Sequence, residues 1–308
     1  MNIFLFLGSR RGYASLKKFI ALQTKVCGIL CLIEDEHEEA FYPKITELAN
    51  AHHIPIFFSN DIKSSQYQEV VASCKPDIAF AIGWRFLINE KTYRLPLKGT
   101  LVLHDSLLPK YRGFAPMNWA IINGETETGV TLFLMVDAVD AGPIIDQLKV
   151  NIDEEDTAAS LDKKIITLYE KIIEKNLDQL ISGDYPLIPQ NEVDATFTCK
   201  RTPEDGLIDW RMSAMQINNL IRGTSEPFPG AFTYLHGQRV IIWQAHVTKV
   251  QPVYVGVVPG RILGKKDRVI EVLTGQGVLC IDRLQVEGQP IVAAQEFAVS
   301  VKDTFKDL

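Results

Sequence analysis

The sequence has few cysteines, and they lack the pattern of a disulfide-bonded or zinc-binding protein. Five are present in 308 residues, an odd number. They lie far apart or in apolar surroundings, at Cys27, Cys31, Cys74, Cys199 and Cys280. We therefore expect no disulfide framework and no bound metal. Cys27 and Cys31 fall within one apolar segment and are predicted to be core thiols, a metal or redox role being the alternative.

Long apolar runs and clusters of basic residues are also missing. No run approaches the roughly 18 apolar residues that a membrane span needs. The apolar run near the N-terminus, residues 3–7, is short and precedes the basic residues, the wrong order for a secretory signal. A formal net charge of -6 argues against a dedicated nucleic-acid binder. We expect a soluble, cytoplasmic protein that binds neither membranes nor nucleic acid.

What the sequence does contain is an alternation of short β-rich runs with helix-like segments. Its length alone predicts about two domains. Strands are predicted at residues 3–7, 26–33, 54–58 and 78–82, with helices at 13–23, 42–52 and 65–74. Two further strands are predicted at 101–103 and 130–136, with a helix at 114–123 between them. This order indicates an α/β domain built on a parallel sheet with helices on its faces.

The second half of the chain changes character. A helix is predicted over residues 156–181, and residues 184–205 carry three prolines with little periodicity. Five short strands are expected after them, at 231–235, 238–244, 253–258, 269–273 and 277–282. The sequence thus predicts a first domain of residues 1–184, a linker of 185–205 and a small β barrel or sandwich of 206–308.

The richest stretch for chemistry runs from residue 101 to 147. His104 ends an apolar run, and Asp140 lies between another apolar run and Gly142. A lone histidine is more often structural, but His104 is followed at once by a loop dense in polar, aromatic and turn-forming residues that packing does not require. A histidine and an acid at the ends of two apolar segments are typical of a general acid/base pair. We therefore expect an enzyme.

A second candidate is the turn after the first predicted strand, at residues 8–12. Nucleotide-binding folds present backbone amides to phosphate at this position. The turn is not the G-x-G-x-x-G pattern of dinucleotide folds. Arg10 and Arg11 are predicted to hold a substrate phosphate there, and a solvated turn is the alternative.

The residues of this stretch resemble a known family. The motif runs His104-x-Ser106-Leu107-Leu108-Pro109-x-Tyr111-Arg112-Gly113, followed by Gly129-Val130-Thr131 and Asp140-x-Gly142. It is similar to the 10-formyltetrahydrofolate-dependent formyltransferases, and the similarity extends through Arg201 to Trp210 and Arg222 to Phe232. The resemblance implies a Rossmann-like formyltransferase domain followed by an OB-like β barrel.

The resemblance also implies a chemistry. In that family an amine attacks the formyl carbon of the folate through a tetrahedral oxyanion, aided by an Asn-x-His motif and a distant Asp. His104 and Asp140 match the histidine and the aspartate, whereas Val102 stands at the position of the asparagine. Losing one oxyanion donor costs on the order of 100- to 1000-fold in rate. Valine has no hydrogen-bond donor to replace it.

Three explanations of Val102 remain open: another donor serves, the enzyme is slow, or the chain is a catalytically silent relative. The donor could be a protonated His104, the Ser106 hydroxyl or a loop amide. We favour a modified but active site, because the histidine, the acid and the loop are all retained. In this hypothesis Asp140 orients His104 and raises its proton affinity, so that the charged ring stabilises the oxyanion. Asp140 or an associated water then accepts the amine proton.

For the folate co-substrate, 10-formyltetrahydrofolate, the resemblance implies two contact segments. One is the loop of Trp84, Arg85, Phe86 and Leu87, and the other is Val136, Asp137, Ala138 and Val139. Trp84 and Phe86 could instead be core aromatics.

For the acceptor, the resemblance favours the amine of a nucleotide-linked amino sugar. A 4-amino-4,6-dideoxyhexose on UDP or dTDP, used in surface polysaccharide synthesis, is the predicted type. Its predicted contacts are Arg10, Arg11, Ser106, Leu107, Leu108, Pro109, Tyr111, Arg112 and Gly113. Methionyl-tRNA is the alternative acceptor, which the acidic charge disfavours. The oligomeric state is open, with a homodimer as one possibility.

Overall fold

The computed structural model describes residues 1–35, 38–60 and 63–306. The chain divides into two compact units. Unit 1 comprises Met1–Pro116, Thr128–Val150 and Lys163–Thr198, and unit 2 comprises Met117–Glu127, Asn151–Asp162 and Cys199–Leu308. This division is not a single cut along the chain, because two internal segments belong with the C-terminal residues. Domain boundaries at residues 184 and 206 remain our proposal.

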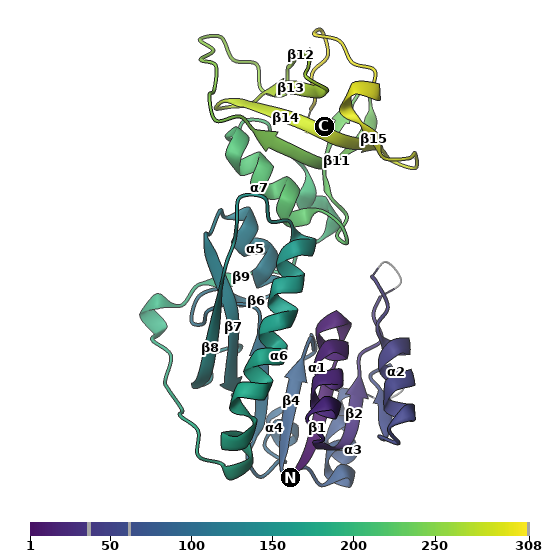
Figure 1. Ribbon diagram of the computed structural model, residues 1–308, viewed down its shortest axis with the longest axis vertical. Coiled ribbons are helices and arrows are strands. Elements are labelled where there is room, and N and C mark those ends of the chain that lie inside the picture. The colour runs from purple at the N-terminus through teal and green to yellow at the C-terminus, as the bar shows by residue number, and fades with distance from the viewer. Residues whose placement is uncertain (36–37, 61–62, 307–308) are drawn as a thin grey trace. The chain divides into compact units, whose positions relative to one another are not determined.

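Unit 1 is built on a seven-stranded sheet in the order β3-β2-β1-β4-β5-β7-β8. Strands β1, β2, β4, β7 and β8 are labelled in Figure 1. The strands are β1 (Asn2–Leu7), β2 (Lys25–Cys31), β3 (Ile56–Phe58), β4 (Ile78–Ile82), β5 (Thr100–His104), β7 (Glu127–Leu134) and β8 (Ile144–Asn151). The neighbours from β3 to β5 are parallel, which confirms the predicted parallel sheet. β7 runs antiparallel to β5 instead, and β8 lies beside β7 although the sequence did not predict it.

The helices of unit 1 fall close to their predicted places. They are α1 (Ser9–Ala21), α2 (Tyr42–Ala51), α3 (Tyr67–Cys74) and most of α6 (Ala158–Ser182). The short α4 (Glu90–Tyr93) also belongs to unit 1 and was not predicted from the sequence. α1 begins four residues earlier than predicted, because the Glu34 carboxylate accepts hydrogen bonds from the amides of Ser9 and Tyr42, at 3.0 and 3.2 Å. One acid thus serves the first turns of both α1 and α2, a tertiary contact that no local pattern reveals.

The sheet owes its burial to continuous apolar strands. β1 and β4 are buried along almost their whole length, as expected for strands covered on both faces. Phe4 and Phe6 of β1 meet edge to face with centroids 5.1 Å apart, and they pack with Tyr67 and Val71 of α3. This core fixes the position of β5 and therefore of its terminal residue, His104.

Unit 2 contains an antiparallel sheet in the order β10-β11-β14-β13-β12, with β15 beside β14. Its elements are α7 (Ala214–Thr224), β10 (Ala231–Leu235), β11 (Gln238–Val247), β12 (Ile262–Lys266), β13 (Val269–Leu273), β14 (Val278–Val286) and β15 (Val292–Ala293). Four predicted strands are confirmed, and the one at 253–258 is wrong. Val253 and Val255 there are 91% and 103% exposed, so an apolar run without a partner strand was mistaken for a strand. Barrel closure of the OB type remains a prediction.

The remaining elements are short. They are α5 (Pro116–Ile122), β6 (Arg112–Gly113), β9 (Phe197–Thr198), and the 3-10 helices η1 (Ser64–Gln66), η2 (Glu192–Asp194), η3 (Pro203–Gly206) and η4 (Ala294–Glu296). Over residues 1–35, 38–60 and 63–306, none of the helices is long and apolar enough to cross a membrane. Within that same part of the chain, no three His, Cys, Asp or Glu side chains gather as a metal site would require.

Candidate active site

The site is centred on the carboxyl end of β5. His104 is the last residue of this strand and is 8% exposed. Val102 lies two residues earlier and therefore on the same face of the strand. It is partly buried and packs against Leu108, Phe133 and Ile144. The position of the family asparagine is thus filled here by an apolar contact.

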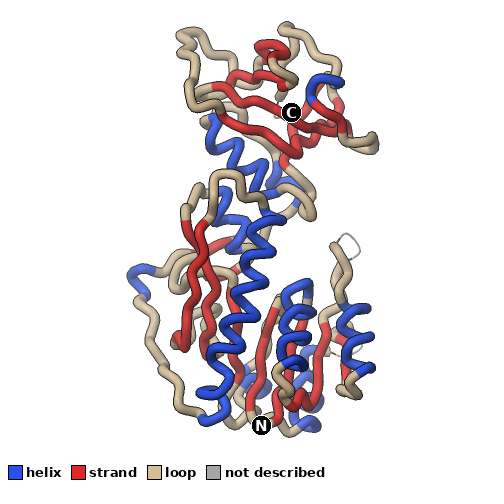
Figure 2. Tube along the Cα trace, viewed as in Figure 1, coloured by secondary structure: helices blue, strands red, loops and turns tan. Residues whose placement is uncertain are grey.

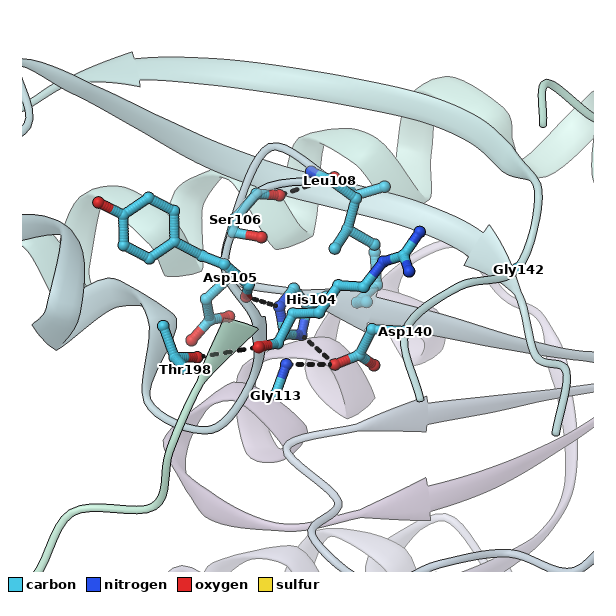
Figure 3. Close-up of polar contacts among 12 residues, drawn as sticks. His104, Asp105, Ser106, Leu108, Gly113, Asp140, Gly142 and Thr198 are labelled. Carbon is cyan, nitrogen blue, oxygen red and sulfur yellow. Dashed lines mark hydrogen bonds and ion pairs between the residues drawn. The ribbon is translucent and has the colours of Figure 1, made fainter. Parts of the chain in front are cut away.

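Both nitrogens of the His104 ring face oxygen atoms (Figure 3). Nε2 lies 2.8 Å from the carbonyl oxygen of Tyr111, and Nδ1 lies 3.6 Å from Oδ2 of Asp140. A carbonyl only accepts hydrogen bonds, so Nε2 carries the hydrogen and donates it. The Nδ1 to Oδ2 distance is too long for a hydrogen bond but well within ion-pair range. The structure therefore brings the predicted pair together, with Nδ1 facing the Asp140 carboxylate.

The chain does not bring Asp140 to His104 by the route we expected. Because β7 is antiparallel to β5, its carboxyl end at Leu134 lies opposite Leu101, and His104 lies opposite Thr131. Asp140 belongs instead to the loop between β7 and β8. The two candidate catalytic side chains thus come from a strand end and from a returning loop.

Local backbone geometry holds Asp140 in place. Its φ of 51° is left-handed, and its Oδ2 accepts a 2.8 Å hydrogen bond from the amide of Gly113. Gly113 has a φ of 105°, and a Cβ at this position would come within 2.4 Å of the Thr198 carbonyl oxygen. Only glycine fits both requirements. The Gly113 amide is consequently committed to the carboxylate.

The loop after His104 is held by Thr131 of β7, which is fully buried. Its hydroxyl donates to the Ser106 carbonyl at 2.6 Å and accepts from the Leu108 amide at 3.1 Å and from Gln147 at 2.9 Å. The Ser106 hydroxyl itself donates to the Lys110 carbonyl at 2.7 Å. Of the donors considered for the oxyanion, Ser106 and the amides of Leu108 and Gly113 therefore already have acceptors within the protein. The strongest remaining candidate is Nδ1 of His104, which is a donor only when the ring is protonated.

The predicted acceptor-binding residues of this loop differ in their surroundings. Leu108 is 3% exposed and belongs to the core beside Phe133. Leu107, Pro109 and Tyr111 are partly exposed. Together with Gly113, which is also partly exposed, they are the members of this group with surface available to a ligand.

Arg112 is directed into the protein. It is 2% exposed, and its guanidinium donates to both Glu192 carboxylate oxygens, at 2.8 and 2.9 Å, and to Oε1 of Gln190, at 2.8 and 3.1 Å. The hydrogen bond from Arg112 holds the pKa of the Glu192 carboxyl below its ordinary value. In this structure the side chain predicted to bind substrate therefore contacts the protein's own chain.

Arg10 and Arg11 leave the first turn of α1 toward different partners. Nη2 of Arg10 lies 2.6 Å from Glu39, and its guanidinium stands over the ring of Phe41 at 5.4 Å. Nε of Arg11 lies 2.7 Å from Oδ2 of Asp105, the residue after His104. Arg11 thus connects the phosphate-type turn to the site, whereas Arg10 faces the segment before α2.

The first predicted folate segment follows β4. The Trp84 ring packs edge to face with Phe6, Tyr67 and Phe86, at centroid distances of 5.5, 5.8 and 5.9 Å. Arg85 pairs with Glu38 at 2.7 Å and with Asp35 at 3.2 Å. Phe86 and Leu87 are 46% and 81% exposed. The segment therefore combines a core tryptophan with apolar side chains open to a ligand.

The second predicted folate segment, residues 136–139, is exposed throughout. Val136 and Val139 are 36% and 54% exposed. Asp137 accepts a 2.9 Å hydrogen bond from the Tyr93 hydroxyl. Burial raises the pKa of Tyr93, which keeps this hydroxyl protonated as a donor. These residues present apolar surface of the kind that an aromatic ligand covers.

Sequence reasoning missed several residues that shape the site. Thr131 appeared only within a motif, without a role, and Tyr93, Gln147 and Gln190 were not singled out. Tyr93 lies in a single helical turn, and Gln190 follows a proline in a segment without periodicity. Neither position carries a local signal, because its partners lie 44 or more residues away.

Two hollows of about 430 and 500 Å³ lie in unit 2. Tyr234, His236 and Lys302 help to line the first, and Met215, Val253 and Tyr254 the second. His104 and Asp140 line neither. We place the chemistry at β5, where the paired titratable groups are, rather than at either of these hollows.

Comparison with known sequences identifies the family of the chain. Residues 34–177 match the formyl transferase family, and residues 200–302 match the formyl transferase C-terminal domain. The chain belongs to the formyltransferase family. It is also 33% identical, over 320 aligned positions, to the bifunctional polymyxin resistance protein ArnA of Wigglesworthia glossinidia brevipalpis. That alignment covers 100% of this chain and 48% of ArnA, so the formyltransferase spans about half the length of this relative.

Solved structures show the same fold. HypX from Aquifex aeolicus, in complex with tetrahydrofolic acid, matches with a TM-score of 0.65 at 18% identity, over 95% of this chain and 46% of HypX. An N-formyltransferase from Helicobacter canadensis, in complex with folinic acid and dTDP-3-aminofucose, matches with a TM-score of 0.67 at 18% identity, over 91% of this chain and 98% of its own. At these identities the likeness concerns the fold.

Proposed function

We propose that this formyltransferase moves the formyl group of 10-formyltetrahydrofolate to the amine of a nucleotide-linked amino sugar. The acceptor type we propose is a 4-amino-4,6-dideoxyhexose on UDP or dTDP. The observation that carries the proposal is the 3.6 Å approach of His104 Nδ1 to Asp140, in a chain of this family. At this distance the Asp140 carboxylate is close enough to orient the imidazole ring and to accept a proton beside it.

The proposed reaction requires one bond to form and one to break. The acceptor nitrogen attacks the formyl carbon, and the carbonyl oxygen takes the electron pair. As the oxygen re-forms its double bond, the bond from the formyl carbon to N10 of the folate breaks, and N10 takes up a proton. Asp140, directly or through a water, accepts the proton that the amine loses. The His104 ring stabilises the negative oxygen from its Nδ1 edge.

The folate part of the proposal is supported by exposed apolar surface. Phe86, Leu87, Val136 and Val139 are all at least 36% exposed. Phe86 and Leu87 follow β4, which is parallel to β5, and Val136 and Val139 lie in the loop that returns from the antiparallel β7 to Asp140. Such surface suits the flat rings of a folate. HypX and the Helicobacter enzyme were both crystallised with folates.

The acceptor part is supported by the charge and by the first turn of α1. A net charge of -6 does not favour a polyanion as large as tRNA. Arg11, close to Asp105, is suited to a compact diphosphate beside the site. The Helicobacter enzyme carries dTDP-3-aminofucose.

The experiment is a substrate panel. The protein is incubated with 10-formyltetrahydrofolate and, in turn, each of several UDP- and dTDP-amino sugars and methionyl-tRNA, and release of tetrahydrofolate is followed. Turnover with an amino sugar supports the proposal, and turnover only with methionyl-tRNA would replace it.

A second candidate function is favoured by Val102 alone. Without the asparagine, the chain could hold folate or a sugar nucleotide without turnover. Stoichiometric binding with no release of tetrahydrofolate, for every acceptor in the panel, would establish this silent relative and reject the enzyme.

A further inference from the structure

The segment between α6 and β9, most of which lies in the predicted linker of residues 185–205, belongs to unit 1 and pairs with it at two places. Ile188 and Ile144 exchange two hydrogen bonds of 2.8 Å at the start of β8. Farther on, β9 pairs with β6, and the Thr196 hydroxyl accepts from the Tyr111 amide at 2.9 Å. Figure 2 draws most of this segment as loop, with one short helix. Its course brings it against both loops that support the reacting groups.

The side-chain amide of Gln190 connects those two loops. Its nitrogen donates to the carbonyl oxygens of Asp140, at 2.8 Å, and Gly142, at 2.7 Å. Its oxygen accepts from Nε and Nη2 of Arg112, at 3.1 and 2.8 Å. Both N–H groups and both lone pairs are therefore used. A flipped amide would oppose donors to donors and acceptors to acceptors, so the network permits one orientation.

We infer that Gln190 is a positioning residue of the formyl-transfer reaction, which holds Asp140 at its working distance from His104. The inference rests on the proposed function for its kinetic consequence. The amide holds the left-handed backbone of Asp140 from one side, while the Gly113 amide holds its carboxylate from the other.

The same side chain reaches the histidine through Arg112. Tyr111, the residue before it, offers the carbonyl that fixes Nε2 of His104. Arg112 is almost fully buried and is anchored by two hydrogen bonds to Glu192. Arg112 therefore connects Gln190 to the loop whose Tyr111 carbonyl orients the His104 ring. One amide thus fixes both partners of the pair.

Removing this amide leaves two carbonyl oxygens without their donor. The loop from Leu134 to Ile144 is then free to shift, and the carboxylate moves with it. A displacement of about 1 Å in a catalytic group is sufficient to cost on the order of 100-fold in rate. The proposed folate and sugar contacts do not include Gln190, so the KM values should change little.

The test compares Gln190→Met with Val193→Ser in the full chain. Methionine keeps the length of the side chain without its hydrogen bonds, and Val193 lies in the same segment with 91% exposure. Two measurements are made: kcat and KM for both substrates, and the ¹⁵N resonances of the His104 ring in the ligand-free protein. For Gln190→Met we expect kcat to fall about 10- to 100-fold, both KM values to stay within about twofold, and the His104 signals to move. Val193→Ser should match the wild type in both measurements.

Gln190→Glu provides a second variant if the methionine variant does not fold. It keeps an acceptor for Arg112 but turns an oxygen toward the carbonyls of Asp140 and Gly142, so it should lose at least as much kcat. Wild-type kcat and unmoved His104 signals in a folded Gln190 variant would overturn the inference. A raised KM with kcat retained would also overturn it, since it would indicate direct substrate contact. If the wild type turns over no acceptor, the proposed function fails, and the His104 resonances alone decide whether Gln190 positions the pair.

Discussion

Restoring the family asparagine, by Val102→Asn, tests how this site stabilises the oxyanion. Val102 and His104 lie on one face of β5 with Cα atoms about 7 Å apart, so an amide at position 102 would enter the same space as the ring. An added oxyanion donor is worth on the order of 100- to 1000-fold in rate when nothing else fills its role. Since His104 already supplies part of that stabilisation, we expect kcat to rise about tenfold or more.

The same substitution should weaken the ligand-free fold. Val102 packs against Leu108, Phe133 and Ile144, and a buried amide without a partner costs about 1–3 kcal/mol. The free energy of unfolding, measured with urea, should fall by that amount and recover in part when folate is bound.

Val102→Asp is the matched control for this prediction. It has nearly the shape of asparagine, but its carboxylate cannot donate a hydrogen bond at neutral pH. Steady-state release of tetrahydrofolate should therefore rise for the asparagine variant and not for the aspartate variant. A folded, folate-binding Val102→Asn protein with unchanged or lower kcat would refute the reasoning, since it would show that no oxyanion donor is lacking at this position.

Three further predictions follow from single contacts. His104→Ala should lower kcat by about 100-fold or more, because it removes the proposed oxyanion donor; wild-type turnover in the tetrahydrofolate assay would disprove that role. Gly113→Ala should lower the melting temperature, because its Cβ would lie 2.4 Å from a carbonyl oxygen at a φ of 105°; an unchanged melting curve would contradict the backbone geometry. At about pH 6 the melting temperature of the wild type should be higher than that of the Glu192→Gln variant. Because Arg112 lowers the pKa of Glu192, the difference in melting temperature should be present above pH 4.5, the ordinary pKa of a glutamate, and should vanish as the pH falls through the lowered pKa. A difference that persists below the lowered pKa would argue against the ion pair.

The sequence predicted the parallel part of the sheet because its strands are continuous apolar runs between helix-like segments. It did not predict β8, whose partly exposed residues give a weak pattern, or α7. Residues 253–258 were wrongly predicted as a strand, because β-branched residues alone do not supply a pairing edge.

For the candidate site, the pairing of His104 with Asp140 could be predicted from their sequence context, but the position expected for Asp140 in the fold was not the observed one. The interpretation placed both at strand ends, whereas the antiparallel β7 puts Asp140 on a returning loop. The neighbours that hold them could not be found from the sequence. Gln190 is 50 residues from Asp140, and Arg112 looks the same in the sequence whether it faces a phosphate or Glu192.

The number of residues in the loop between β7 and Asp140 matters as much for the His104–Asp140 pair as the identity of the two residues. Between Leu134 and Asp140 the chain travels from a fixed strand end to a point beside the imidazole. One residue inserted or deleted there would displace the acid by up to about 3.5 Å, as much as the 3.6 Å that separates it from His104. A formyltransferase of this design therefore tolerates exchange of side chains in this hairpin more readily than a change in their number.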